Sequence, residues 1–80
     1  EPYLITLRDD AQPYASFRHD GIEMIYMLSG RVTYRHGDEV YEMWPGDTLM
    51  FDSHAPHGPE ECIEKPISYL SIIVYPRQVD

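Results

Sequence analysis

Short runs of alternating apolar and polar residues dominate this chain, and turn residues separate them. In the run 31–35, Val32 and Tyr34 fall on one face of an extended chain, while the three residues around them are polar and share the other face. No segment of eleven or more residues shows a clear apolar period of 3.6. The pattern therefore predicts strands and gives almost no signal for helices.

Reading the pattern along the chain predicts about seven or eight short strands. The turn residues Asp20-Gly21, Ser29-Gly30, His36-Gly37-Asp38 and Trp44-Pro45-Gly46-Asp47 separate most of them, with Gly30 closing a hairpin. Residues 52–66 hold three prolines and read as a loop. Such spacing predicts an all-β antiparallel sandwich or barrel. The strands predicted are Tyr3–Leu7, Tyr14–His19, Glu23–Leu28, Arg31–Arg35, Glu39–Met43, Thr48–Phe51 and Ile67–Tyr75.

The length and the net charge of the chain limit the classes of function that this segment can have. Eighty residues form one small domain, 1–80, whose core is marginal alone, so we expect an oligomer or a larger parent protein. A net charge of −8 opposes binding of this segment to nucleic acid or to an anionic membrane. No apolar run approaches the roughly 20 residues of a membrane span. The single Cys62 forms no internal disulfide, which suits the cytoplasm.

Candidate chemistry centres on one acidic residue. Glu23 shares a strand face with Ile25 and Met27, and if that face is the barrel interior its carboxylate needs a partner. His57, at the start of a strand on the opposite sheet, is a candidate for facing inward. Phe17 and His19 also share one face.

The spacing of these residues resembles the cupin family, whose first motif is His, any residue, His, three or four residues, Glu, six residues, Gly. His19, Glu23 and Gly30 match it, while Phe17 stands at the first His. The second motif is Gly, five residues, Pro, any residue, Gly, two residues, His. Gly46 and His57 match its ends.

The chain departs from this second motif at three positions: Asp52 stands at its Pro, His54 at its Gly, and Glu61 at the Asn that closes it. The resemblance covers about the whole chain and implies a small antiparallel β-barrel, the double-stranded β-helix or jelly roll of cupins.

The resemblance implies three metal ligands, His19, Glu23 and His57. Two imidazoles and one carboxylate suit Fe(II), and also Zn, Ni or Mn. The other interpretation is that these residues line a pocket and hold no metal. Arg31 and Arg35 form a solvated outer face or an anchor for an acidic ligand. We expect the ligand pocket to be lined by Phe17, His19, Glu23, Ile25, Met27, Phe51 and His57.

The runs 19–30 and 45–57 are most similar to the sensor cupins of bacterial transcription regulators. That likeness implies a small-molecule effector inside the barrel, a homodimer paired through sheet edges such as Tyr3–Leu7, and a helix-turn-helix in a missing N-terminal part that contacts DNA. The chain would then be a C-terminal fragment of a longer regulator.

Two alternatives stay open. A small metal-dependent enzyme of the dioxygenase or isomerase type would use His19, Glu23 and His57, and no catalytic base or nucleophile is apparent beyond them. A metal-free module that binds carbohydrate or another small molecule is the third possibility.

Overall fold

Two long strands organise the fold, because each of them runs through both layers of the molecule. The computed structural model describes residues 2–7 and 20–75, and this part of the chain contains strands and no helix. The long strands are β2 (Ile22–His36) and β5 (His57–Val74). The short ones are β1 (Pro2–Leu7), β3 (Glu39–Met43) and β4 (Thr48–Asp52).

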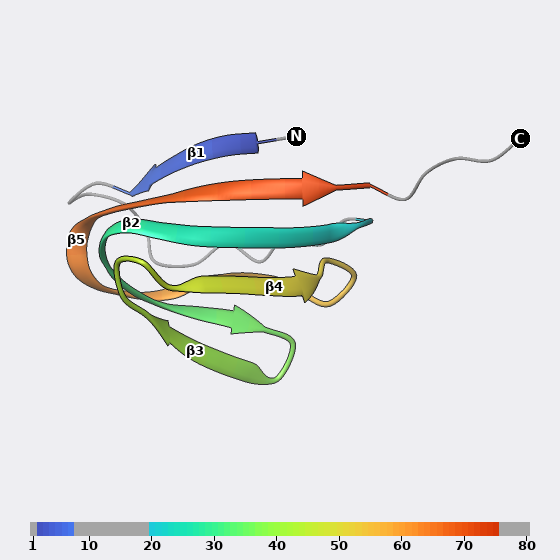
Figure 1. Cartoon of the computed structure of the whole chain (residues 1–80). Coiled ribbons are helices and arrows are strands. Elements are labelled where there is room, and N and C mark those ends of the chain that lie inside the picture. The colour runs from blue at the N-terminus through green and yellow to red at the C-terminus, as the bar shows by residue number, and fades with distance from the viewer. Residues whose placement is uncertain (1, 8–19, 76–80) are drawn as a thin grey trace, which may run out of the picture.

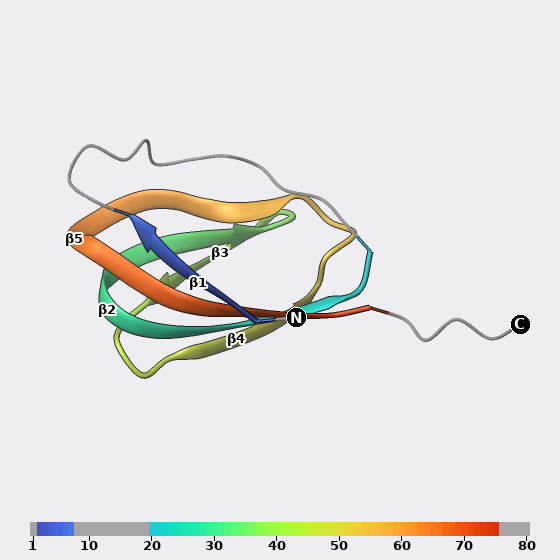
Figure 2. The ribbon, with the colours of Figure 1, turned by 90° about the horizontal axis from the view of Figure 1, so that it is seen from above.

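All pairings between the strands are antiparallel, and they divide into two layers (Figures 1 and 2). In the first layer, the first half of β2 lies between β4 and the second half of β5, and β1 pairs with β5 at the edge. In the second layer, the second half of β2 lies between β3 and the first half of β5. Figure 2 shows both long strands bending at one end of the molecule, where they cross between the layers.

The expected all-β fold is confirmed, and so are several strand faces. Val32 and Tyr34 are 0% and 2% exposed, as their alternation predicted. The predicted strand Glu39–Met43 coincides with β3, and Ile67–Val74 forms the second half of β5. The predicted strand Tyr14–His19 lies outside the described residues. The core of the described part lies between the layers and consists of Ile25, Met27, Val32, Tyr34, Met43, Phe51, Ile67 and Tyr69.

The hairpin predicted at Gly30 is wrong. Gly30 has the positive φ expected of a turn glycine, +77°, but it lies inside β2, and the pairing with β5 shifts register on both sides of it. A Cβ at this position would lie 2.5 Å from the carbonyl oxygens of Glu64 and Pro66. The glycine therefore bends a continuous strand from one layer into the other while β5 crosses closely over it.

The loop predicted over residues 52–66 is also wrong in its second part, because β5 begins at His57. Three prolines argued against a strand there. Pro59 lies opposite Tyr34, beside a register shift, in the half of β5 whose only described neighbour is β2. A strand edge tolerates proline because the missing N–H is not needed for pairing on that side. Within the described residues, no helix is long and apolar enough to cross a membrane.

Candidate functional site

A cavity of about 150 Å³ opens between the layers beside the core. Most of its wall is apolar or aromatic, and three polar side chains, from Glu23, His57 and Ser71, interrupt it. A largely apolar cavity with a few convergent polar groups is the usual form of a small-molecule site. The remaining lining residues come from β1, β2 and β5: Tyr3, Ile5, Tyr34, Tyr69 and Ile73.

Glu23 reaches the cavity because β2 alternates strictly over its first half. Glu23 is 5% exposed and Ile25 and Met27 are fully buried, which confirms the predicted shared face. Ser71 Oγ donates a hydrogen bond of 2.7 Å to Glu23 Oε2. The second carboxylate oxygen, Oε1, lies 3.1 Å from Nε2 of His57. Both oxygens of this buried carboxylate are therefore hydrogen-bonded, as burial requires.

His57 lies at the start of β5, and its ring is held from both nitrogens. Nδ1 lies 2.9 Å from the carbonyl oxygen of Ala55, to which it donates its proton. The contact of Nε2 with Glu23 then needs one further proton, shared between the imidazole and the carboxylate. Burial lowers the pKa of His57, but the hydrogen bonds to Glu23 and Ala55 and the charge of Glu23 outweigh it, so its pKa lies above 6.5.

Two tyrosines complete the polar environment. Tyr34 and Tyr69 pack edge to face with ring centroids 6.2 Å apart. Burial raises the pKa of both phenols well above the ordinary value, and the nearby charge of Glu23 raises it further. Both hydroxyls therefore stay protonated at neutral pH and can donate hydrogen bonds to a ligand.

The structure distributes the residues expected to line the pocket in three ways. Glu23 and His57 line the cavity and contact each other. Ile25, Met27 and Phe51 lie in the adjoining core, with the Phe51 ring centroid 4.9 Å from that of His57. Phe17 and His19 lie outside the described residues.

Six of the lining residues are absent from the pocket predicted from the sequence: Tyr3, Ile5, Tyr34, Tyr69, Ser71 and Ile73. Alternation along the strands groups most of these residues, since Tyr69, Ser71 and Ile73 share one face of β5, and Tyr3 and Ile5 share one face of β1. What the pattern lacked was the pairing of β1 with β5, which places these two faces side by side.

Glu23 and His57 also have a geometry compatible with a metal ion. Two donor atoms 3.1 Å apart can share an ion whose bonds are about 2.1 Å long, and the Nδ1–H donated to a carbonyl is a common support of a metal-binding histidine. Among the described residues, no cluster of three histidine, cysteine or acidic side chains is arranged to hold a metal. The described residues thus supply two donors, and the third expected ligand, His19, lies outside them.

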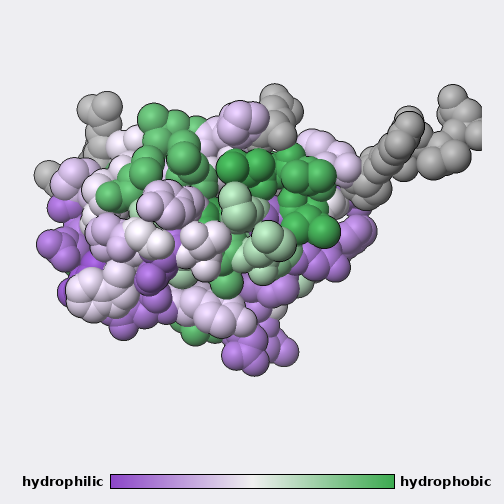
Figure 3. Space-filling model, viewed as in Figure 1, coloured by the Kyte–Doolittle hydropathy of each residue, from purple (hydrophilic) through white to green (hydrophobic). Residues whose placement is uncertain are grey.

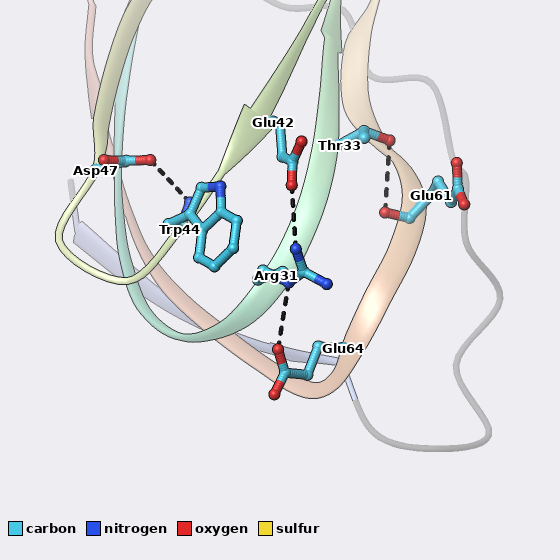
Figure 4. Close-up of polar contacts among 7 residues, drawn as sticks. All are labelled: Arg31, Thr33, Glu42, Trp44, Asp47, Glu61 and Glu64. Carbon is cyan, nitrogen blue, oxygen red and sulfur yellow. Dashed lines mark hydrogen bonds and ion pairs between the residues drawn. The ribbon is translucent and has the colours of Figure 1, made fainter.

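Arg31 and Arg35 lie away from the cavity and are engaged with acidic residues. The Arg31 guanidinium contacts Glu42 and Glu64 at 3.2 and 3.3 Å and stacks over the Trp44 ring at 4.4 Å (Figure 4). Arg35 Nε lies 2.6 Å from Glu60. These contacts favour the outer-face interpretation of both arginines over an anchor for an acidic ligand.

The model of the Cupin domain family matches residues 4–73. The chain belongs to the cupin family. No significant match to this cupin is found among curated proteins or among solved structures. The family accounts for the two-layered antiparallel barrel, and the chemistry of the site depends on its own residues.

Proposed function

We propose that this cupin is the small-molecule sensor domain of a bacterial transcription regulator. The observation that carries the proposal is the cavity between the layers, whose apolar wall surrounds three buried polar groups on Glu23, His57 and Ser71. The likeness of runs 19–30 and 45–57 to sensor cupins supports the regulatory role. In this proposal the domain works in the cytoplasm, and DNA contact belongs to a helix-turn-helix elsewhere in the parent protein.

The shape of the site limits its ligand. A cavity of about 150 Å³ is large enough for a small organic molecule or for one end of a larger one. The wall favours an apolar body, and the Tyr34 and Tyr69 hydroxyls together with the hydrogen-bonded Glu23–His57 pair favour a polar group that both donates and accepts hydrogen bonds.

A ligand screen by thermal shift, followed by calorimetric titration of the hits, tests the sensor role. We expect binding to be lost in Ser71→Leu and in Ile5→Phe, since each substitution fills the cavity from a different strand. Ser68→Leu is the matched control, because Ser68 lies on the opposite face of β5 and does not line the cavity. Hits that bind the cavity-filling variants as tightly as the wild type would contradict this site.

The regulatory part of the proposal has its own test. We expect the reading frame upstream of Glu1 to encode a basic helix-turn-helix, and the full-length protein to bind its operator differently with and without a confirmed ligand. A parent protein without any DNA-binding segment would exclude the regulator role and leave a binding module.

A metal-dependent enzyme is the second candidate, favoured by the 3.1 Å approach of Glu23 Oε1 and His57 Nε2. It would use His19 as a third ligand, and the ion would activate water, oxygen or substrate. This candidate predicts stoichiometric Fe, Zn, Ni or Mn in protein purified without a metal-affinity column, and loss of that metal in His57→Ala. Protein that takes up none of these ions in equilibrium dialysis would rule it out.

A further inference from the structure

The acid and the imidazole in the cavity wall are paired with each other before any ligand enters. Glu23 and His57 are 5% and 1% exposed, so both side chains lie out of water. Glu23 Oε1 lies 3.1 Å from His57 Nε2, and Ser71 Oγ donates to Glu23 Oε2 at 2.7 Å. Each carboxylate oxygen therefore already has a hydrogen-bond partner within the wall.

The strongly basic side chains of the described part lie elsewhere. Among the described residues, no lysine or arginine lines the cavity. Arg31 and Arg35 lie away from it and contact acidic side chains, and Figure 3 shows hydrophilic side chains toward the margins of the molecule. Proteins commonly hold carboxylate and phosphate groups with an arginine fork or a lysine. The described wall offers an anionic ligand neither of these groups.

A charged ligand would therefore lose its water without gaining a counter-charge. An anion would lie close to the buried Glu23 carboxylate, and an ammonium group would compete with His57 for the same oxygen. Moving an ion out of water without a free partner costs far more than moving a neutral group that forms hydrogen bonds. The wall thus disfavours ligands of either sign.

The wall does provide hydrogen bonds for an uncharged group. Tyr34 and Tyr69 each bring a hydroxyl to the cavity wall. Ser71 Oγ gives its proton to Glu23, so its lone pairs are the part that can serve a ligand, as acceptors. The aromatic rings and the isoleucines of β1 and β5 surround these groups with apolar surface. A hydroxyl, carbonyl or carboxamide group on an apolar body matches this arrangement.

We propose that the ligand of this cavity is an uncharged, mostly apolar molecule with a hydroxyl, carbonyl or carboxamide group, and that Glu23 is the residue that excludes anions. This assignment rests on the sensor function proposed above, in its form without a bound metal, and adds the chemical class of the ligand. It also excludes the acidic ligand that the sequence left open for Arg31 and Arg35.

A titration with four probes of similar shape, followed by ligand-observed NMR at pH 7 in the presence of a chelator, tests this charge selection. The probes are benzamide, its anionic isostere benzoate, benzyl alcohol and benzylammonium. We expect both uncharged probes to bind at least about tenfold more tightly than either ion. Ile5→Phe, which fills the cavity, should abolish the binding of the uncharged probes and so locate them.

Glu23→Gln tests the role assigned to Glu23. It removes the charge and keeps the shape, so benzoate no longer meets a carboxylate and His57 can donate to it. We expect the preference for benzamide over benzoate to fall by about tenfold or more, whereas a merely structural role would weaken both probes alike and leave their ratio unchanged. Glu64→Gln is the matched control, because it makes the same charge change at a side chain that is 67% exposed and does not line the cavity. Far-UV circular dichroism checks the fold of each variant, and the comparison of the four probes on the wild type does not depend on them.

The outcomes separate this charge selection from the sensor function. Wild-type protein that binds benzoate or benzylammonium as tightly as benzamide would overturn the charge selection and leave a ligand-binding cavity in place. Benzoate that binds only after zinc is added would overturn it in favour of the metal site. Folded wild-type protein that binds none of the four probes would overturn it as well, and an empty ligand screen beside that result would count against the sensor function itself.

Discussion

At the scale of single residues, the contact between Glu23 and His57 joins an acid and an imidazole that both line the cavity. The Ala55 carbonyl fixes the Nδ1 proton of the imidazole, and Ser71 occupies one carboxylate oxygen, so the remaining nitrogen and oxygen face each other with one proton between them. Burying either side chain in its charged form without a partner would cost a large free energy. Each residue provides the partner that the other needs.

The raised pKa of His57 predicts a pH-dependent stability. Between pH 6.5 and the higher pKa of His57 in the folded state, the folded protein holds a proton on His57 that the unfolded protein has lost. Folding therefore takes up protons in this pH range, and stability falls as the pH rises through it. The contribution of the pair is complete below the unfolded pKa and disappears above the folded pKa. We therefore expect the difference in free energy of unfolding between wild type and His57→Gln to be larger at pH 5.5 than at pH 9.

Urea unfolding in the presence of a chelator measures this difference. His54→Gln is the control, since His54 is exposed and its ion pair with Asp20, at 3.3 Å, is screened by solvent. This control should change stability little at either pH. A difference for His57→Gln that grows with pH would show that the proton is not held as described.

At the scale of elements, the bend in β2 decides how one strand serves two layers. Register shifts around Ser29 and Arg31 mark the bend, and Gly30 adopts a φ of +77° where β5 crosses over it. Beyond the bend, the Arg31 contacts with Glu42, Glu64 and Trp44 link β2 to β5 and to the end of β3 (Figure 4). Each of these contacts is exposed enough to be weak, so the close backbone approach at Gly30 matters more.

Gly30→Ala should destabilise the protein by more than about 2 kcal/mol. Its Cβ would combine an unfavourable φ with a 2.5 Å approach to two backbone carbonyls, neither of which can move like a flexible side chain. Gly46→Ala is the matched control: its φ is +92°, but nothing lies within 4 Å of its Cβ, so only the strain of about 1 kcal/mol applies. Chemical denaturation of both variants measures the contrast, and equal losses would argue against the close approach at Gly30.

At the scale of the whole molecule, the layers are not independent units, because β2 and β5 belong to both. Residues 22–28 of β2 pair in one layer and residues 31–36 in the other, and β5 accompanies them throughout. The core formed by the described residues lies between the layers, so neither layer retains its packing without the other.

This arrangement predicts one cooperative unfolding transition. Far-UV circular dichroism, which follows the strands, and near-UV circular dichroism, which follows the packing of buried rings such as Tyr34 and Tyr69, should give coincident urea curves. Separate midpoints would indicate that one layer unfolds before the other. A midpoint that does not change with protein concentration would show that no change of oligomeric state accompanies the transition.

Local residue patterns by themselves determined much of this cupin. Alternation is a property of every strand, so it predicted the all-β class, the buried side of β3, and the shared inward face of Glu23, Ile25 and Met27. The motif spacing around Glu23 and His57 also indicated that an acid and an imidazole would matter. These features depend on a few neighbouring residues, which is the range over which a pattern carries information.

Only the tertiary structure decided the rest, because it depends on contacts between distant residues. Gly30 looks the same in sequence whether it closes a hairpin or bends a long strand, and the crossing of β5 selected the bend. The pairing of β1 with β5, up to 70 residues apart at Pro2 and Ile72, added Tyr3 and Ile5 to the cavity wall. Register and crossover set which faces meet, and no local pattern encodes them.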